Sequence, residues 1–393
     1  MVHLGAEAAR EAARLYSSTG RLSDALLRPE IHRAWERSHR MGADPRRWRA
    51  AALGVGDTER LVARHAALMA AAGPYLRALS QAAGAYPHAA MLSDARAVVL
   101  DATGDEHTLH GPEPVPGPGS LLDEGTTGVN GLGTPLAEGC YVEIVGPEHF
   151  IEGFRVFTCQ GIPLRDGAGQ VVGALSTLVR RPEVSLRLRD MLLCAAHGIE
   201  AELLRASLEA RLADLLADPD PTHPVLERLY LDLIQKHASA RMRVELASEQ
   251  LGLGHSLRAA DVLKLALRAI EDYRREAAFW RAVASPEQGG PSVPVDLAEV
   301  ARDLASLLQG EAASHRSRLV LHDLEPVTAC ADPDALRATL LRAFVSALQL
   351  GRGGAVLVDV RREPSRGLVS LTPLPGSGVV IGAPRPILVA VPL

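Results

Sequence analysis

The sequence predicts an α/β multidomain protein, and three observations support that prediction. The chain has 393 residues, 47% of them hydrophobic, so two or three domains of ordinary size can each bury a core. Apolar residues recur at helical spacing in long stretches, and short β-rich runs broken by glycine and proline alternate with them. Two proline-rich breaks divide the second half of the chain.

The first 180 residues change once from a helical pattern to a strand-rich pattern. Residues 1–85 alternate alanine and leucine with arginine and glutamate at helical spacing, which predicts an N-terminal helical region. Residues 86–180 contain β-rich runs, and the proline- and glycine-rich stretch 111–119 is expected to be a loop arching over one side. The predicted strands include Ala89–Leu92, Ala97–Leu100, Tyr141–Val145 and Gln170–Val179.

Long helices follow. Helical spacing returns over 184–217 and closes a domain that spans 86–217. Three prolines make 218–224 a stiff hinge, and two further helices are expected at Val225–Gly252 and Ser256–Ala284. A hairpin of two helices buries its apolar stripes best against a partner, so 225–284 is expected to form a homodimer. A second linker, 285–292, leads to a C-terminal domain at 293–393.

The most informative stretch runs from Glu124 to Glu138. It has glycine at positions 125, 128, 131 and 133. Glycine costs roughly 0.5–1 kcal/mol against alanine inside a helix or strand, so this spacing predicts a tight turn that leads into a short helix. Thr126, Thr127 and Asn130 are candidate N-caps of that helix. Because strands follow, we expect a pocket wall and not a phosphate loop.

Motifs on both sides agree with this interpretation. They are Ile31–Ser38, Glu148–Phe150, Cys159–Pro163 and Asp166–Gly173. Together with the glycine-rich stretch, they resemble the sensory GAF domain of bacterial sigma-54-dependent activators of the acetoin-catabolism type. Here the Gly-Thr-Asn core of that family is stretched to Gly125–Asn130. The resemblance extends over about half of the chain.

The resemblance implies a cavity that binds a small-molecule effector or a regulatory protein. The candidate ligand-binding residues are Glu124, Thr126, Thr127, Asn130, Glu148, His149, Phe150 and Cys159. Each also has a structural interpretation: a helix cap, a buried ion pair, a core ring or, for the cysteine, a small buried hydrophobic group. Trp35 and Trp48 are expected to anchor the N-terminal helices to this domain.

The last hundred residues resemble a histidine-kinase ATPase domain. The segments concerned are Val295–Leu304, Leu319–Asp323, Cys330–Leu341 and the closing strand Pro386–Leu393. In that family the next helix holds two asparagines at the nucleotide and its magnesium. Arg342 and Ser346 occupy those positions here, and an arginine would repel the ion. The family's adenine-binding aspartate is replaced by Thr372 at best.

Other catalytic motifs are missing from the sequence. Neither His237 nor His255, the histidines of the hairpin, has an acid beside it, and no phosphate-loop motif is present. We therefore expect a degenerate ATPase-like domain that binds no cofactor and no metal, ATP and magnesium included. The alternative is a divergent, active sensor histidine kinase that uses ATP.

Composition limits the partners. The net charge is −5, so DNA is not an expected partner. Seven arginines lie from Arg28 to Arg49, and this segment forms either a solvated helix face or a surface that binds an anion, a partner or DNA. The four cysteines are widely spaced, which favours a reducing cytoplasm over a disulfide framework or a zinc site. Neither a membrane span nor a secretory leader is expected. The hypothesis is a cytoplasmic bacterial signal-sensing regulator.

Overall fold

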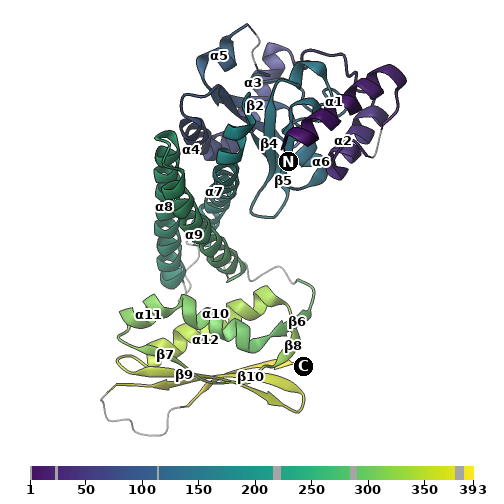
Figure 1. Cartoon of the computed structure of the whole chain (residues 1–393). Helices are drawn as coiled ribbons and strands as arrows, with labels where there is room; N and C mark the ends of the chain where they lie inside the picture. The colour runs from purple at the N-terminus through teal and green to yellow at the C-terminus, as the bar shows by residue number, and fades with distance from the viewer. Residues whose placement is uncertain (1, 23–24, 113–114, 216–222, 284–289, 377–384) are drawn as a thin grey trace. The chain divides into compact units, whose positions relative to one another are not determined.

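The computed structural model describes the chain except for residues 1, 23–24, 113–114, 216–222, 284–289 and 377–384. It divides into two compact units (Figure 1). The first comprises Met1–Leu204 with Lys236–Glu271, and the second comprises Arg205–Gln235 with Asp272–Leu393. Most of the expected hinge and linker lies outside the described residues. In the part of the chain that is described, every helix is too short or too polar to cross a bilayer.

A five-stranded antiparallel sheet forms the centre of the first unit, in the order β2-β1-β5-β4-β3. Its strands are β1 (His88–Asp94), β2 (Val99–Gly104), β3 (Val142–Val145), β4 (Thr158–Arg165) and β5 (Val171–Val179). Every residue of β1 is buried, because helices cover both faces of the sheet. The β-rich runs identified in the sequence overlap β1, β2, β3 and β5.

Short and medium helices surround this sheet. They are α1 (Val2–Thr19), α2 (Pro29–Arg40), α3 (Val55–Arg64), α4 (Ala66–Ala83), α5 (Glu106–His110) and α6 (Gly133–Glu138), with 3-10 turns η1 (Gly146–Glu148) and η2 (Glu152–Phe154). Helix α4 contacts β1 and β2. Residues of α1 and α2 join the other face of the sheet in one apolar core. That second face carries the motifs singled out in the sequence.

Three long helices follow: α7 (Pro182–Leu215), α8 (His223–Gly252) and α9 (Ser256–Val283). Their ends lie within about two residues of the predicted ones. In the first unit, the Ser248 hydroxyl donates to the carbonyl of Ala78 at 2.6 Å, and Arg187 donates to the carbonyl of Leu251 at 3.1 Å. The C-terminal end of α8 is therefore held against α4 and α7.

The second unit contains a four-stranded sheet in the order β11-β10-β9-β7, in which only β7 and β9 are parallel, and a two-stranded sheet of β6 and β8. The strands are β6 (Val293–Asp296), β7 (Arg318–Leu324), β8 (Thr328–Ala331), β9 (Ala355–Glu363), β10 (Arg366–Leu374) and β11 (Ile387–Pro392). Helices α10 (Leu297–Leu307), α11 (Gln309–Ser314) and α12 (Pro333–Leu350) gather on one face of the larger sheet (Figure 1).

Aspartate caps begin the two longer helices of this unit. The Asp296 carboxylate accepts from the second and third N–H groups of α10, and Asp332 does the same for α12, where Pro333 follows at the first helical position. Each cap is worth about 1 kcal/mol. The predicted α/β multidomain class therefore agrees with the structure at the level of mixed helices and largely antiparallel sheets.

Candidate functional site

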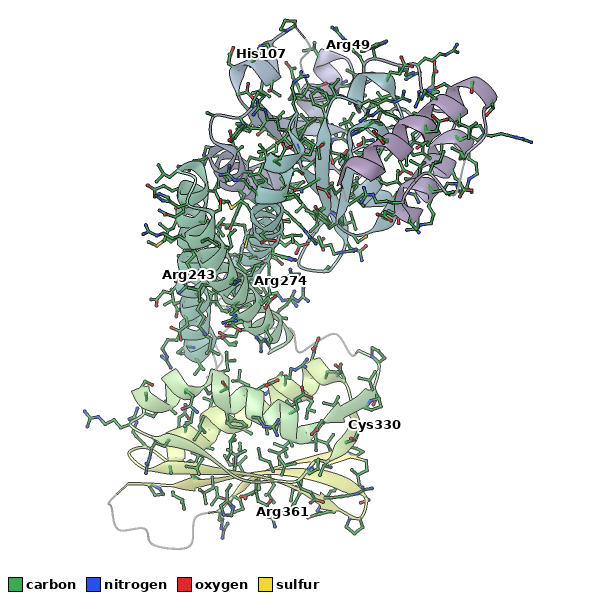
Figure 2. The ribbon with its side chains drawn as sticks, viewed as in Figure 1. Arg49, His107, Arg243, Arg274, Cys330 and Arg361 are labelled. Atoms are coloured by element: carbon green, nitrogen blue, oxygen red, sulfur yellow. The ribbon has the colours of Figure 1, made fainter. Side chains whose placement is uncertain are left out.

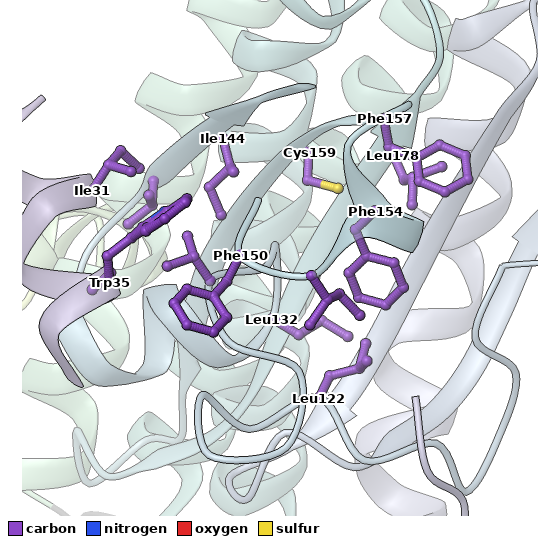
Figure 3. Close-up of a cluster of buried hydrophobic side chains, with 14 of the residues drawn as sticks. Ile31, Trp35, Leu122, Leu132, Ile144, Phe150, Phe154, Phe157, Cys159 and Leu178 are labelled. Carbon is purple, nitrogen blue, oxygen red and sulfur yellow. The ribbon is translucent and has the colours of Figure 1, made fainter. Parts of the chain in front are cut away.

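Trp35 fastens α2 to the sheet of the first unit. Its side chain is fully buried, its indole N–H donates to the carbonyl of Glu148 at 2.8 Å, and its ring meets Tyr16 and Phe150 with centroid distances of 5.5 and 5.1 Å. Figure 3 shows Trp35 and Ile31 entering the same apolar cluster as Phe150. The prediction that Trp35 anchors an N-terminal helix is confirmed.

Arginines of α2 and its N-cap neutralise the acids of the glycine-rich region. Arg37 bonds both oxygens of Glu124, at 2.6 and 3.0 Å, and also reaches Glu138 at 2.6 Å. Arg28 bonds both oxygens of Glu148, at 2.8 and 2.6 Å. We call these residues, with Arg33 on Glu138, the α2 clamp. The Glu124 and Glu148 side chains are only 3% and 7% exposed, so the clamp occupies their oxygens from within the chain.

The clamp also perturbs ionisation. Hydrogen bonding to Glu124 raises the pKa of Arg37 despite its partial burial. Burial alone would raise the pKa of Glu138, but hydrogen bonds from Arg33 and Arg37 outweigh it and lower that pKa. Both effects keep the charged pairs ionised near neutral pH.

Asn130 holds the glycine-rich turn in shape. Its amide nitrogen donates to the carbonyls of Leu122 and Gly128, each at 2.7 Å, and its oxygen accepts from the N–H groups of Leu132 and Gly133, each at 2.9 Å. Asn130 therefore stabilises the turn that leads into α6, but it is not the N-cap residue expected from the sequence: that position belongs to Leu132, two residues later.

Thr126 and Thr127 do not cap α6. Both belong to the preceding turn at Asp123: the Thr126 hydroxyl donates to its carboxylate at 2.6 Å, and the Thr127 hydroxyl donates to its carbonyl at 3.3 Å. Capping of α6 by these threonines is therefore a wrong expectation, because the stretched core places them one turn too early.

His149 and Cys159 are both deeply buried. Burial lowers the pKa of His149 to about 4, so the ring is neutral at pH 7, and its Nδ1 lies 2.9 Å from the carbonyl of Gly146. Burial raises the pKa of Cys159 to about 12, which leaves the thiol protonated and unreactive. Phe150 packs in the aromatic cluster. As ligand contacts, the eight candidate residues stay predictions.

An apolar cavity of about 460 Å³ lies beside this core, within the size range of small-molecule sites. Its lining residues include Trp48, Arg49, Val115, Phe154, Val156 and Phe157, and we call it the Trp48 cavity. None of the eight candidate residues lines it. Phe154 and Phe157 line this cavity and also belong to the buried cluster, in which Figure 3 labels both.

Backbone contacts place Trp48 at this cavity. The N–H groups of Glu152 and Gly153 donate to the carbonyls of Pro45 and Arg47, at 2.9 and 3.3 Å. Any side chain at Gly153 would lie 2.0 Å from the Trp48 carbonyl oxygen, so this approach requires glycine. Trp48 itself is 67% exposed. The expectation that Trp48 anchors the N-terminal helices is therefore wrong.

Sequence reasoning missed most of the cavity. Trp48 stands among arginines with no apolar periodicity, which was the available signal that its ring does not enter a helix interface. Val115 and Pro116 come from the proline- and glycine-rich loop, which was expected to arch over one side of the domain.

The residues aligned with a nucleotide site lie in the second unit. Arg342 and Ser346 are exposed one turn apart on α12, and Thr372 is half-buried on β10. The stretch 377–384, which includes part of the expected adenine-binding segment, lies outside the described residues. In the hairpin, His237 is 5% exposed with Nε2 at 3.7 Å from Glu202, whereas His255 is exposed. A phosphate acceptor must reach a bound nucleotide, which burial of His237 opposes.

Similarity to known proteins is concentrated in the first half of the chain. Residues 5–196 match the family model described as the MimR N-terminal domain. The chain is 25% identical over 195 residues to the acetoin dehydrogenase operon transcriptional activator AcoR of Bacillus subtilis (strain 168), covering 49% of this chain and 32% of that protein. This half is similar to the sensory domain of transcriptional regulators.

A second regulator agrees. The signal-transduction and transcriptional-control protein of Clostridium beijerinckii is 33% identical over 85 residues, which cover 22% of this chain and 13% of that protein. The alignments therefore span a third or less of the length of these two curated relatives. The similarity is therefore to a part of each regulator, and it does not extend to the activity of the whole protein.

Solved structures show weaker likeness. The Escherichia coli DhaR(N)–DhaL complex aligns with a TM-score of 0.46 at 20% identity, covering 48% of this chain and 66% of that chain. Histidine kinase ThkA in complex with response regulator TrrA aligns with a TM-score of 0.18 at 12% identity, covering 60% and 63%. Both TM-scores are low, so the role of the second unit depends on its own residues.

Proposed function

We propose that the chain is a bacterial signal-sensing regulatory protein whose GAF-like N-terminal unit binds a small-molecule effector or a regulatory protein. The observation that carries this proposal is the Trp48 cavity, an apolar space of small-molecule size at the edge of a sensor core. The α2 clamp occupies the oxygens of Glu124, Glu138 and Glu148, so these acids are already paired within the chain.

The similar proteins support a regulatory role. Their names assign them to transcriptional activation and to signal transduction. The matched region holds the clamp, the glycine-rich turn and the cavity, whereas it ends before the hairpin. The similarity therefore supports the sensing part of the proposal, and the output is argued from the residues of this chain.

The proposed organisation follows the sequence. An N-terminal helical region, 1–85, joins a sensor domain, 86–217, and a hairpin, 225–284, leads to a degenerate ATPase-like domain, 293–393. Helices α7, α8 and α9 lie in the sequence between the sensor strands and the C-terminal strands, and they are the elements proposed to pass a change in the sensor onward. A ligand shifts such a system only through its different affinity for two states, typically by about 1–3 kcal/mol.

The C-terminal domain is proposed to be without phosphotransfer activity. Arg342 and Ser346 replace the two asparagines expected at magnesium and nucleotide, and both are exposed on α12. A guanidinium cannot supply the oxygen ligands that Mg²⁺ requires. The buried His237 is also a poor phosphate acceptor.

Thermal denaturation of the full chain with a metabolite library tests this function. We expect at least one compound to raise the melting temperature, because a ligand that binds only the folded state stabilises it by mass action. The shift should disappear in Trp48→Ala. Incubation with radiolabelled ATP and Mg²⁺ should leave the protein unlabelled. A chain that binds no compound but labels itself would be an active histidine kinase, and the proposal would be wrong.

A further inference from the structure

We infer that the Trp48 cavity takes a small apolar carboxylic acid, with its ring or alkyl chain against Phe154 and Phe157 and its carboxylate at Arg49. This inference rests on the proposed function and names the chemical class of the effector. Three features of the cavity support it: its apolar lining residues, the Arg49 side chain that lacks a counter-charge, and the effect of that positive charge on other ligands.

The wall is suited to an apolar body. Phe154 and Phe157 are 7% and 4% exposed, and Val115 is buried, so these three residues give the cavity an apolar inner surface, to which Ser120, 8% exposed, adds one hydroxyl. Trp48 and Val156 are exposed and form the outer part of the wall. A space of about 460 Å³ accommodates a molecule of one or two rings or a short alkyl chain.

Arg49 supplies a cation without a counter-charge. Other arginines of this segment already have partners. Arg28 and Arg37 form ion pairs with buried acids of the clamp. Arg46 pairs with Asp44 at 3.5 Å, and Arg47 donates to the carbonyl of Thr126 at 3.4 Å. Among the described residues, neither a hydrogen bond nor an ion pair engages Arg49, and no acid lines the cavity. A guanidinium binds a carboxylate through two parallel hydrogen bonds, so Arg49 (labelled in Figure 2) selects for an anion.

The charge of Arg49 also disfavours other ligands. A cationic ligand at the cavity would be repelled by its guanidinium. The Arg180 guanidinium lies 4.8 Å from the centroid of the Phe157 ring, an aromatic residue that lines the cavity. The remaining competitor is a neutral apolar molecule, which the experiment must separate from the acid.

Paired probes make that separation. The full-length protein is titrated by calorimetry with phenylacetate, 4-phenylbutyrate and hexanoate, and with the amide of each acid. The amide keeps the shape and removes the charge. Binding is followed in parallel by tryptophan fluorescence, in which a ligand at the cavity should change chiefly the emission of the exposed Trp48, because Trp35 and Trp280 are buried. Each titration is repeated with Arg49→Gln and with Arg40→Gln, an exposed arginine outside the cavity lining.

We expect at least one acid to bind about tenfold more tightly than its amide, as a charge-assisted pair at a partly exposed site would give. Arg49→Gln should remove that preference while the amide affinity stays the same, and Arg40→Gln should keep it. The preference should also weaken at high salt.

Two outcomes would overturn the inference. If acids and amides bind equally in both the wild type and Arg49→Gln, the effector is neutral, and the sensing function stands without this ligand class. If none of the six probes binds or alters Trp48 emission, the cavity does not take apolar acids. The proposed function is then tested separately by the thermal screen with the metabolite library, which reports binding anywhere on the chain, and by the incubation with radiolabelled ATP.

Discussion

At the scale of single residues, the sequence identified the groups that matter but not their partners. Glu124 and Glu148 stood out beside glycine-rich and histidine motifs, yet their counter-charges lie on α2 and its N-cap, about a hundred residues upstream. Spacing in a sequence cannot show such a pairing, because only the packing of α2 on the sheet brings the two segments together. The acids are consequently internal ion-pair members here.

Removal of Arg37 tests the clamp. Arg37→Ala leaves the Glu124 carboxyl, whose side chain is 3% exposed, without the guanidinium that pairs with it, so the free energy of unfolding should fall by about 3–5 kcal/mol. Chemical denaturation measures this. The control is Arg46→Ala, whose exposed pair with Asp44 should matter by less than about 0.5 kcal/mol. Equal losses in both variants would contradict a structural clamp.

The buried His149 predicts a pH dependence. Its pKa is lowered to about 4 in the folded protein by burial, against an ordinary value near 6.5, so the unfolded chain binds more protons between these values. The stabilisation is present above pH 6.5 and is lost as the pH falls toward 4. As the pH is lowered from 6.5 toward 4, the free energy of unfolding of the wild type should therefore decrease more steeply than that of His149→Phe. The difference in slope should be up to about 1.4 kcal/mol per pH unit. Parallel curves would show that the ring is protonated without cost.

At the scale of elements, apolar periodicity in the sequence was sufficient to predict the long helices but not the course of the loops. The ends of α7, α8 and α9 follow from apolar spacing and from flanking glycine and proline. The course of residues 45–49 could not be predicted, because it depends on two backbone hydrogen bonds to η2 and not on any local propensity. The cavity, which that loop helps to form, was missed for the same reason.

The glycine-rich turn gives an element-scale prediction. Gly128 has a φ of +66°, and a methyl group there would lie 2.3 Å from the Cβ of Phe150, so Gly128→Ala combines backbone strain with a steric clash in the core. We expect a loss of about 2–4 kcal/mol. Gly169→Ala is the matched control: its φ is +80°, but nothing lies within 4 Å, so only about 1 kcal/mol of strain is expected. Thermal and urea denaturation of both variants measure the difference, and equal losses would mean that the loop moves away from Phe150.

At the scale of the whole molecule, the helical hairpin carries a group of exposed apolar side chains. In the first unit, which includes 236–271, the large apolar residues of α8, α9 and their connection with high exposed fractions are Met242 (68%), Leu246 (46%), Leu253 (62%), Leu257 (87%) and Leu265 (53%). Single exposed apolar residues are ordinary, but five within the 24 residues of one hairpin are the kind of surface that protein interfaces cover. The sequence predicted the two helices and their tendency to pair, whereas which leucines stay exposed depends on α4 and α7, which take up the other side.

We therefore propose that a second copy of the chain covers this surface, consistent with the homodimer expected from the sequence. Each leucine buried in such an interface contributes about 1.5–3 kcal/mol, so charge at two positions should abolish it. Sedimentation velocity should show a dimer for the wild type and a monomer for the double variant Met242→Glu with Leu246→Glu. Leu350→Glu, a 61% exposed position at the end of α12, should remain dimeric. Far-ultraviolet circular dichroism checks that each variant keeps its helices. A wild type that sediments as a monomer at micromolar concentration would leave the surface without a second copy, and signalling would then have to proceed within one chain.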